Sequence, residues 1–128
     1  MVVVLHEYNA SYRQIFYDGR GFPNEMTPAW SGYSVAHWEG DALIVESRGF
    51  RDDGWLDITG NPLTDAARIT ERIRRPNWGS LEIQITIDDP KAYTKPWTVV
   101  IHQKAVLDTE MLDLMCLENN KDLAHMKP

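Results

Sequence analysis

The sequence predicts an all-β domain of eight antiparallel strands that close into an up-and-down barrel of the lipocalin or calycin kind. Apolar and polar residues alternate with a period of two rather than with the helical period of 3.6. Turn residues separate the alternating segments at short intervals. Closing such strands into a barrel removes the exposed sheet edges. A flattened β-sandwich of the same strands is the alternative.

The alternating segments are expected to pair with their neighbours along the chain. The pairs are 2–8 with 12–17, 33–38 with 42–48, 66–74 with 80–88, and 97–106 with 110–117. The clearest segment is 80–88, in which four apolar residues alternate with polar ones, as is typical of a half-buried antiparallel strand. The sequence does not fix which face of 33–48 or of 97–106 points inward. A two-residue turn at Gly40 puts Trp38 on the face of Leu43, and a three-residue turn puts His37 there.

Two connections are too long for tight turns, and loops of this length in small domains often carry function. They run from Arg20 to Gly32 and from Gly49 to Asp65. A single helical turn is expected after Asp88, with Asp89 as its cap.

Length and charge limit the classes of function. The 128 residues predict one domain over 1–128, with a polar tail at 118–128 that frays. The net charge of −6 opposes binding to nucleic acid, and the arginines of 68–75 alternate with apolar residues as on a solvated strand face. The longest apolar run, Val2 to Leu5, is too short for a membrane span, and no signal peptide is evident. We therefore expect no nucleic-acid or membrane partner, and leave the compartment and the oligomeric state, including a homodimer, open.

Several short motifs together point to a family. They are Tyr17-Asp18-Gly19-Arg20, Trp38-Glu39-Gly40-Asp41 followed by Ala42-Leu43-Ile44-Val45, Thr70-Glu71-Arg72, Asp88-Asp89-Pro90, Lys95-Pro96-Trp97-Thr98 and Cys116-Leu117-Glu118-Asn119. Over nearly its whole length the chain resembles the C-terminal part of an uncharacterised bacterial family common in soil and metagenomic sequence. Its members usually have a longer N-terminal region and are often exported. The family has no established activity, so the resemblance assigns no catalytic residues.

Glu71 is the candidate catalytic acid or base. By alternation it shares a face with Ile69 and Ile73, where a carboxylate is costly unless it is paired or hydrogen-bonded. Desolvation favours the neutral form of a carboxyl group, which suits acid–base work near neutral pH. The structural alternative is a glutamate bonded to an arginine, tyrosine or tryptophan inside the barrel. His102 and His37 are the candidates to assist it, although each is also explained as a surface or core residue.

No motif indicates a metal or a cofactor. The four histidines show no short ligand spacing, and the single cysteine, Cys116, has no partner for a paired ligand motif. We expect no metal site, although a barrel could bring His6, His37 and His102 together from distant strands. Neither a phosphate-binding glycine loop nor a dinucleotide fingerprint is present, so no cofactor is expected.

Aromatic residues carry the functional hypothesis. Five tryptophans and five tyrosines are many for this length, and several lie in or beside loops. Such rings suit a site for an apolar or sugar-like molecule, or they plug the barrel ends. We predict that a small, largely apolar molecule binds in the barrel cavity, with Trp38, Tyr33, Trp55 and Trp97 as ligand-binding residues. The alternatives are a hydrolase or isomerase in the same cavity, and a structural or interaction domain of a longer chain.

Overall fold

In the computed structural model of the chain, residues 1–8 and 10–112 are described, and they form strands and loops without a helix. Seven strands make one sheet, and two short strands make a separate ribbon. The sheet strands, in spatial order, are β1 (Val2–His6), β2 (Ser11–Phe16), β3 (Tyr33–Glu39), β4 (Ala42–Arg48), β7 (Arg68–Asn77), β8 (Ser80–Asp88) and β9 (Trp97–Lys104). The ribbon pairs β5 (Gly54–Trp55) with β6 (Pro62–Leu63).

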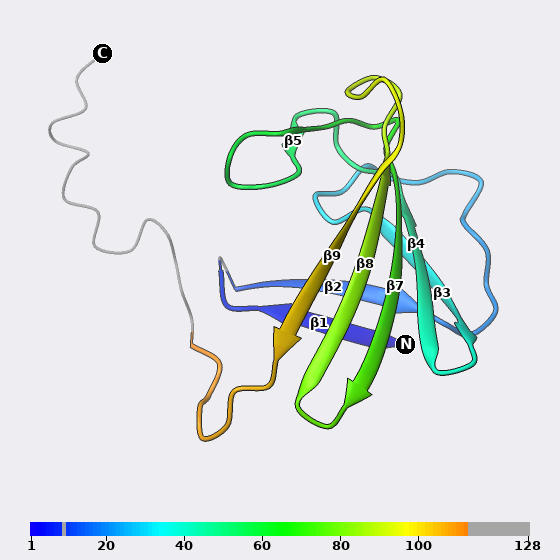
Figure 1. The fold of residues 1–128 in the computed structure, drawn as a ribbon. Helices are drawn as coiled ribbons and strands as arrows, with labels where there is room; N and C mark the ends of the chain where they lie inside the picture. Colours follow the sequence, from blue (N-terminus) through cyan, green and yellow to red (C-terminus); the bar gives the residue numbers. More distant parts are fainter. Residues whose placement is uncertain (9, 113–128) are drawn as a thin grey trace, which may run out of the picture.

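The sheet curls into a half-barrel, and the β1–β2 hairpin runs across the direction of β7, β8 and β9 (Figure 1). The hairpin packs onto the concave face of the sheet. There Ile15 joins Leu43 and Val45 in a buried cluster, against which Val2 and Val4 are packed. This cluster fixes the position of β2 over β3 and β4.

A second cluster lies under the β5–β6 ribbon. Phe50, Leu63 and Ala67 are its buried members. The carboxylate of Asp89 is buried and accepts hydrogen bonds from the Thr64 backbone N–H at 2.8 Å and from its hydroxyl at 2.7 Å. The expected turn after Asp88 is present, since the Tyr93 N–H donates to the Asp89 carbonyl at 2.8 Å.

The prediction of a closed eight-stranded antiparallel barrel is wrong in two respects. First, β2 and β3 are parallel, because the long connection after Tyr17 lets the chain return in the direction of β2. Second, over the described residues the sheet stays open between β1 and β9. Residues 105–112 form no strand and lead to the β1–β2 turn, where the Leu112 N–H donates to Glu7 Oε1 at 3.0 Å. Positions 113–117 of the expected last strand, and the tail 118–128, lie outside the described residues.

Of the four predicted hairpins, the first three along the chain are confirmed, whereas residues 105–112 form no strand beside β9. The registers of the three hairpins decide which side chains face inward. Glu39 pairs with Ala42, so Gly40 and Asp41 form a two-residue turn in which Gly40 has a φ of +61°. This register places Trp38 opposite Leu43 on the concave face and His37 on the convex face. In β7, Glu71 is on the concave face, as the alternation predicts.

Candidate functional site: an aromatic cleft beside a buried arginine

A buried ion pair joins the hairpin to the sheet. Arg13 of β2 reaches across the concave face to Glu71 of β7, and both carboxylate oxygens accept from its guanidinium, Oε1 at 3.1 Å from Nη1 and Oε2 in closer contact with Nη2. The side chains of Arg13 and Glu71 are only 18% and 11% exposed. A charge this buried needs a partner, and the forked geometry supplies two parallel hydrogen bonds.

Two serines complete the shell around the guanidinium. Arg13 Nε donates to Ser34 Oγ at 3.0 Å, and Nη2 donates to Ser47 Oγ at 2.8 Å. Ser34 and Ser47 are cross-strand partners in β3 and β4, and their hydroxyl oxygens lie 2.9 Å apart. Both serines are fully buried, so the guanidinium is their polar contact within the sheet besides each other. These hydrogen bonds hold β2 against the concave face of β3, β4 and β7.

A cleft opens where β2 and β3 separate. The parallel pairing spans only Ile15 with Ser34 and Phe16 with Val35, so the strands diverge toward Arg13 and Gly32. The space between them measures about 320 Å³. It is lined by Tyr12, Arg13, Gln14, Phe16, Ala29, Trp30, Ser31, Gly32, Tyr33 and Ser34. The lining thus combines four aromatic residues with the polar residues Arg13, Gln14, Ser31 and Ser34.

Backbone hydrogen bonds hold the far wall of the cleft in place. The Ala29 N–H donates to the Gly49 carbonyl at 3.0 Å, and the Ala29 carbonyl accepts from the Arg51 N–H at 3.2 Å. Gly32 has a φ of +62°, and a Cβ built there would lie 2.7 Å from the Arg48 carbonyl oxygen. Only glycine fits this bend, which brings Trp30 and Tyr33 to the same cleft.

The aromatic rings of the cleft are held by stacking. The Tyr33 ring stacks on Phe16 with centroids 5.2 Å apart. The Arg51 guanidinium lies 4.4 Å from the centre of the Trp30 ring, and Asp53 accepts two hydrogen bonds from that guanidinium. The same hydrogen bonds raise the pKa of Arg51 and lower the pKa of Asp53.

The cations near the cleft therefore have acidic partners. Arg51 is bound to Asp53, and Arg13 is bound to Glu71. Arg20, which lies 4.2 Å from the centre of the Phe16 ring, is bound to Asp18, and its hydrogen bonds lower the pKa of that carboxyl group. The cleft combines aromatic walls with hydroxyl and amide groups and little net charge.

The structure separates the predicted catalytic residues. Glu71 is on the concave face and is held by Arg13. His37 and His102 are exposed on the convex face, where they lie 3.2 Å from Glu39 and 3.9 Å from Glu82, respectively. The sheet therefore stands between Glu71 and both histidines.

The predicted ligand-binding residues are also spread over the molecule. Tyr33 lines the cleft. Trp38 is exposed at one end of the concave face, and Trp97 lies at the other end, where its ring meets Tyr93 edge-on at 5.6 Å. Trp55 is exposed on the β5–β6 ribbon. Of the four, only Tyr33 belongs to the cleft.

Comparison of the chain with known protein families, curated proteins and solved structures finds no match. The family resemblance stays a prediction. Among residues 1–8 and 10–112, no three His, Cys, Asp or Glu side chains converge as metal ligands. That part of the chain also holds no helix long and apolar enough to span a membrane.

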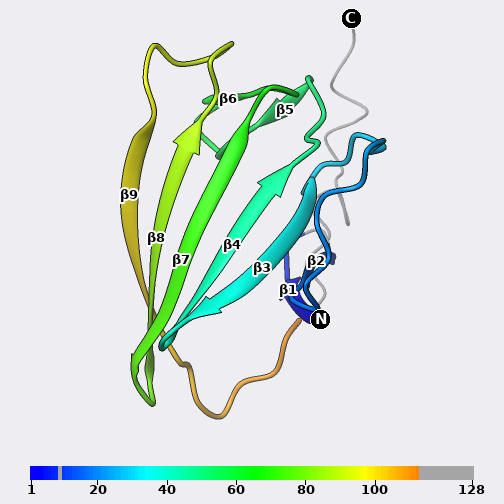
Figure 2. The ribbon, with the colours of Figure 1, turned by 90° about the vertical axis from the view of Figure 1, so that its right-hand side faces the viewer.

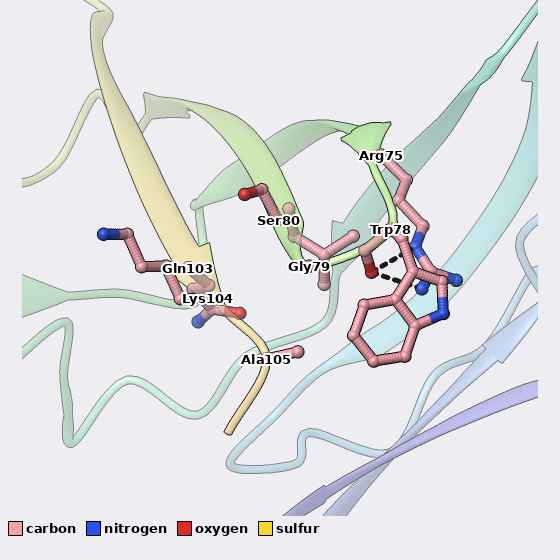
Figure 3. Close-up of a pocket in the computed structure, with 8 residues that line it drawn as sticks. Arg75, Trp78, Gly79, Ser80, Gln103, Lys104 and Ala105 are labelled. Atoms are coloured by element: carbon pink, nitrogen blue, oxygen red, sulfur yellow. Dashed lines mark hydrogen bonds between the residues drawn. The ribbon is translucent and has the colours of Figure 1, made fainter. Parts of the chain in front are cut away.

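Two further hollows have fewer aromatic residues in their linings. One, of about 210 Å³, lies between the β7–β8 turn and the end of β9, and Figure 3 shows Trp78 and Arg75 on one side and Gln103 and Lys104 on the other. There Arg75 donates both of its drawn hydrogen bonds to the Trp78 carbonyl. The other hollow lies beside Met26 and has a larger volume, about 610 Å³, but no aromatic residue lines it.

Sequence reasoning missed Arg13 and both serines. The signal for Arg13 was present, because it alternates with Ile15 and so occupies an inward position, as Glu71 does on its own strand. Two opposite charges at inward positions of different strands favour a buried pair. The cleft itself had no such signal, since it follows from the parallel pairing of β2 and β3.

Proposed function

We propose that this domain binds a small, largely apolar molecule, and that the cleft between β2 and residues 29–34 is the binding site. The observation that carries the proposal is that four aromatic residues and several polar ones line one space of about 320 Å³. Ligand sites for small molecules are concave, mostly apolar and of about this size or larger, with a few polar groups that fix orientation.

The charge of the site selects the class of ligand. Because Arg13 and Arg51 are already bound to carboxylates, an anion entering the cleft gains little from them. A neutral ring compound would stack on Trp30 or Tyr33 and take hydrogen bonds from Ser31 or Gln14 at its polar end. We therefore favour a neutral ligand with one ring face and one polar handle.

The contacts of Glu71 give no support to the alternative of acid–base catalysis. Both of its oxygens accept hydrogen bonds from Arg13, and neither histidine is on its side of the sheet. This arrangement is the one expected of a glutamate that anchors the hairpin. A domain that binds a ligand in the cleft needs no catalytic role for Glu71.

A fluorescent probe tests the proposal. N-phenyl-1-naphthylamine is a neutral compound of one naphthyl and one phenyl group whose emission rises in apolar surroundings, and titration of the full chain with it is expected to saturate. Trp30→Ala removes the most exposed wall of the cleft, so the affinity for the probe should fall about tenfold, the effect of losing roughly 1.4 kcal/mol.

Trp78→Ala is the matched control. Trp78 is as exposed as Trp30 but lies in the β7–β8 turn, outside the cleft. It should leave the affinity unchanged. The proposal is overturned by a wild-type chain that does not bind the probe, or by equal losses in the two variants.

A further inference from the structure

The last strand of the sheet has an open side. Within the described residues β9 pairs with β8 alone, and its other side faces away from the sheet at the left of Figure 2. Such a side presents a row of backbone N–H and C=O groups that another strand can pair with.

The middle of β9 lacks the features that normally protect an edge. Val99, Val100 and Ile101 are consecutive, apolar and 38%, 52% and 41% exposed. Edge strands are usually short or carry lysine, proline or a bulge. β9 has eight residues, no proline, and a single lysine, Lys104, at its very end. The apolar residues alternate between both faces, so neither face of the edge is polar in the middle.

The concave face beside this edge is apolar and uncovered. Val99 and Ile101 pair with Ile85 and Ile83 of β8, and Leu81 continues the row. The β1–β2 hairpin packs instead on Leu43, Val45 and their neighbours. An apolar strip therefore extends over β8 to the free side of β9.

The described chain after β9 does not cover this side. The Ala105 N–H donates to the Gly79 carbonyl at 2.8 Å, which turns the chain at the end of the strand. Residues 106–112 then run beneath the sheet toward the β1–β2 turn (Figure 2). Within residues 1–8 and 10–112, the free side of β9 therefore has no strand partner.

We propose that a second copy of this chain pairs with β9, antiparallel, about a two-fold axis at Val100. In this register Val100 lies opposite its own copy, and Val99 lies opposite the partner's Ile101 on both sides of the axis. Three central pairs are then apolar. Self-pairing of this kind joins the two concave strips into one surface and satisfies the open backbone groups of both copies.

The flanking residues of this register also match. His102 lies opposite the partner's Thr98, Gln103 opposite the partner's Trp97, and Lys104 opposite the partner's Pro96. No two like charges meet across the axis, although each copy carries a net charge of −6. A shift that centres Ile101 would instead place Lys104 opposite the partner's Thr98 and leave one apolar pair.

Sedimentation velocity of the full chain is the first test. The wild-type chain should sediment as a dimer at sub-millimolar concentration. Val100→Lys places two lysines face to face at the axis, so its mass should fall to that of the monomer. Val3→Lys is the control, because Val3 is similarly exposed on β1, the opposite edge of the sheet. This variant should remain a dimer with an unchanged far-ultraviolet spectrum.

Cross-linking tests the register. In a Cys116→Ser background, Val100→Cys should form a disulfide-linked dimer on mild oxidation, since paired antiparallel Cα atoms lie about 4.5–5.5 Å apart. Thr98→Cys should not, because it lies opposite His102. A monomeric wild type, as when the chain's own residues beyond 112 occupy the edge, overturns the proposal. So does a Val100→Lys variant that stays dimeric, or a cross-link at position 98 in place of 100.

Discussion

Removal of Glu71 should destabilise the fold strongly, because it leaves the Arg13 guanidinium buried without a counter-charge. Breaking one partner of a buried pair costs about 3–5 kcal/mol. Arg13 keeps 18% of its side chain exposed and also holds Ser34 and Ser47, so we expect the lower end, about 3 kcal/mol, for Glu71→Ala. For a domain of this size, that loss lowers the melting temperature by about 10 °C.

Urea unfolding followed by tryptophan fluorescence measures this loss, as a shift of the midpoint at constant slope. The double variant Arg13→Met with Glu71→Leu should recover most of the stability, since apolar residues of similar volume replace a buried pair at little cost. Glu39→Ala is the control, because Glu39 is the exposed partner of Arg72 and such pairs contribute little. A Glu71→Ala chain within about 1 kcal/mol of wild type, or a double variant as unstable as the single one, would show that the ion pair does not hold the hairpin in this way.

Two further predictions concern loops. Gly32→Ala should lower the free energy of unfolding by about 2–4 kcal/mol in urea, because φ at this position is positive and the new Cβ meets the Arg48 carbonyl oxygen. Gly19→Ala is the control, since Gly19 also has a positive φ but lies in open space, and it should lower the free energy of unfolding by only about 1 kcal/mol. Equal losses in the two variants would contradict the close approach at Gly32. Hydrogen bonds from Thr59 and Asn61 lower the pKa of Asp57 from 3.8 to about 2. They therefore stabilise this loop above pH 3.8, and that contribution is lost as the pH falls through about 2. The carboxyl carbon resonance of Asp57 should titrate with a midpoint near 2, whereas a midpoint at 3.8 or above would show that the bonds are absent in solution.

Alternation predicted the local structure well. The two central hairpins pair as expected, and the inward position of Glu71 follows from its place between Ile69 and Ile73. The two-residue turn at Gly40, one of two options, was decided by the pairing of Glu39 with Ala42. These features depend on neighbours in sequence, where periodicity carries the information.

Closure of the sheet depends on pairings between distant segments, and periodicity carries no information about them. Nothing in residues 17–32 reveals that the chain crosses over before β3 and pairs parallel to β2. The polar residues of the cleft were hidden for the same reason. Arg13 was detectable as an inward charge, but its pairing with Glu71 requires the hairpin to fold back across the concave face.

The aromatic residues show a similar limit. Trp30, Tyr33, Trp55 and Trp97 all lie in or near loops in the sequence, yet only the first two line one cleft. The backbone hydrogen bonds that join Ala29 to Gly49 and Arg51 hold the neighbouring Trp30 in the wall of the cleft. Composition pointed to aromatic residues in general, and tertiary hydrogen bonds decide which of them line the cleft.

Amide and indole N–H shifts of the labelled chain, followed while N-phenyl-1-naphthylamine is added, test the binding site most directly. Binding in the cleft predicts saturable changes at the Trp30 indole and at the Ser31 and Gly32 amides, with β9 residues such as Ile101 unmoved. Changes confined to Ile101 and the concave face of β8, with the Trp30 and Gly32 signals constant, would contradict it.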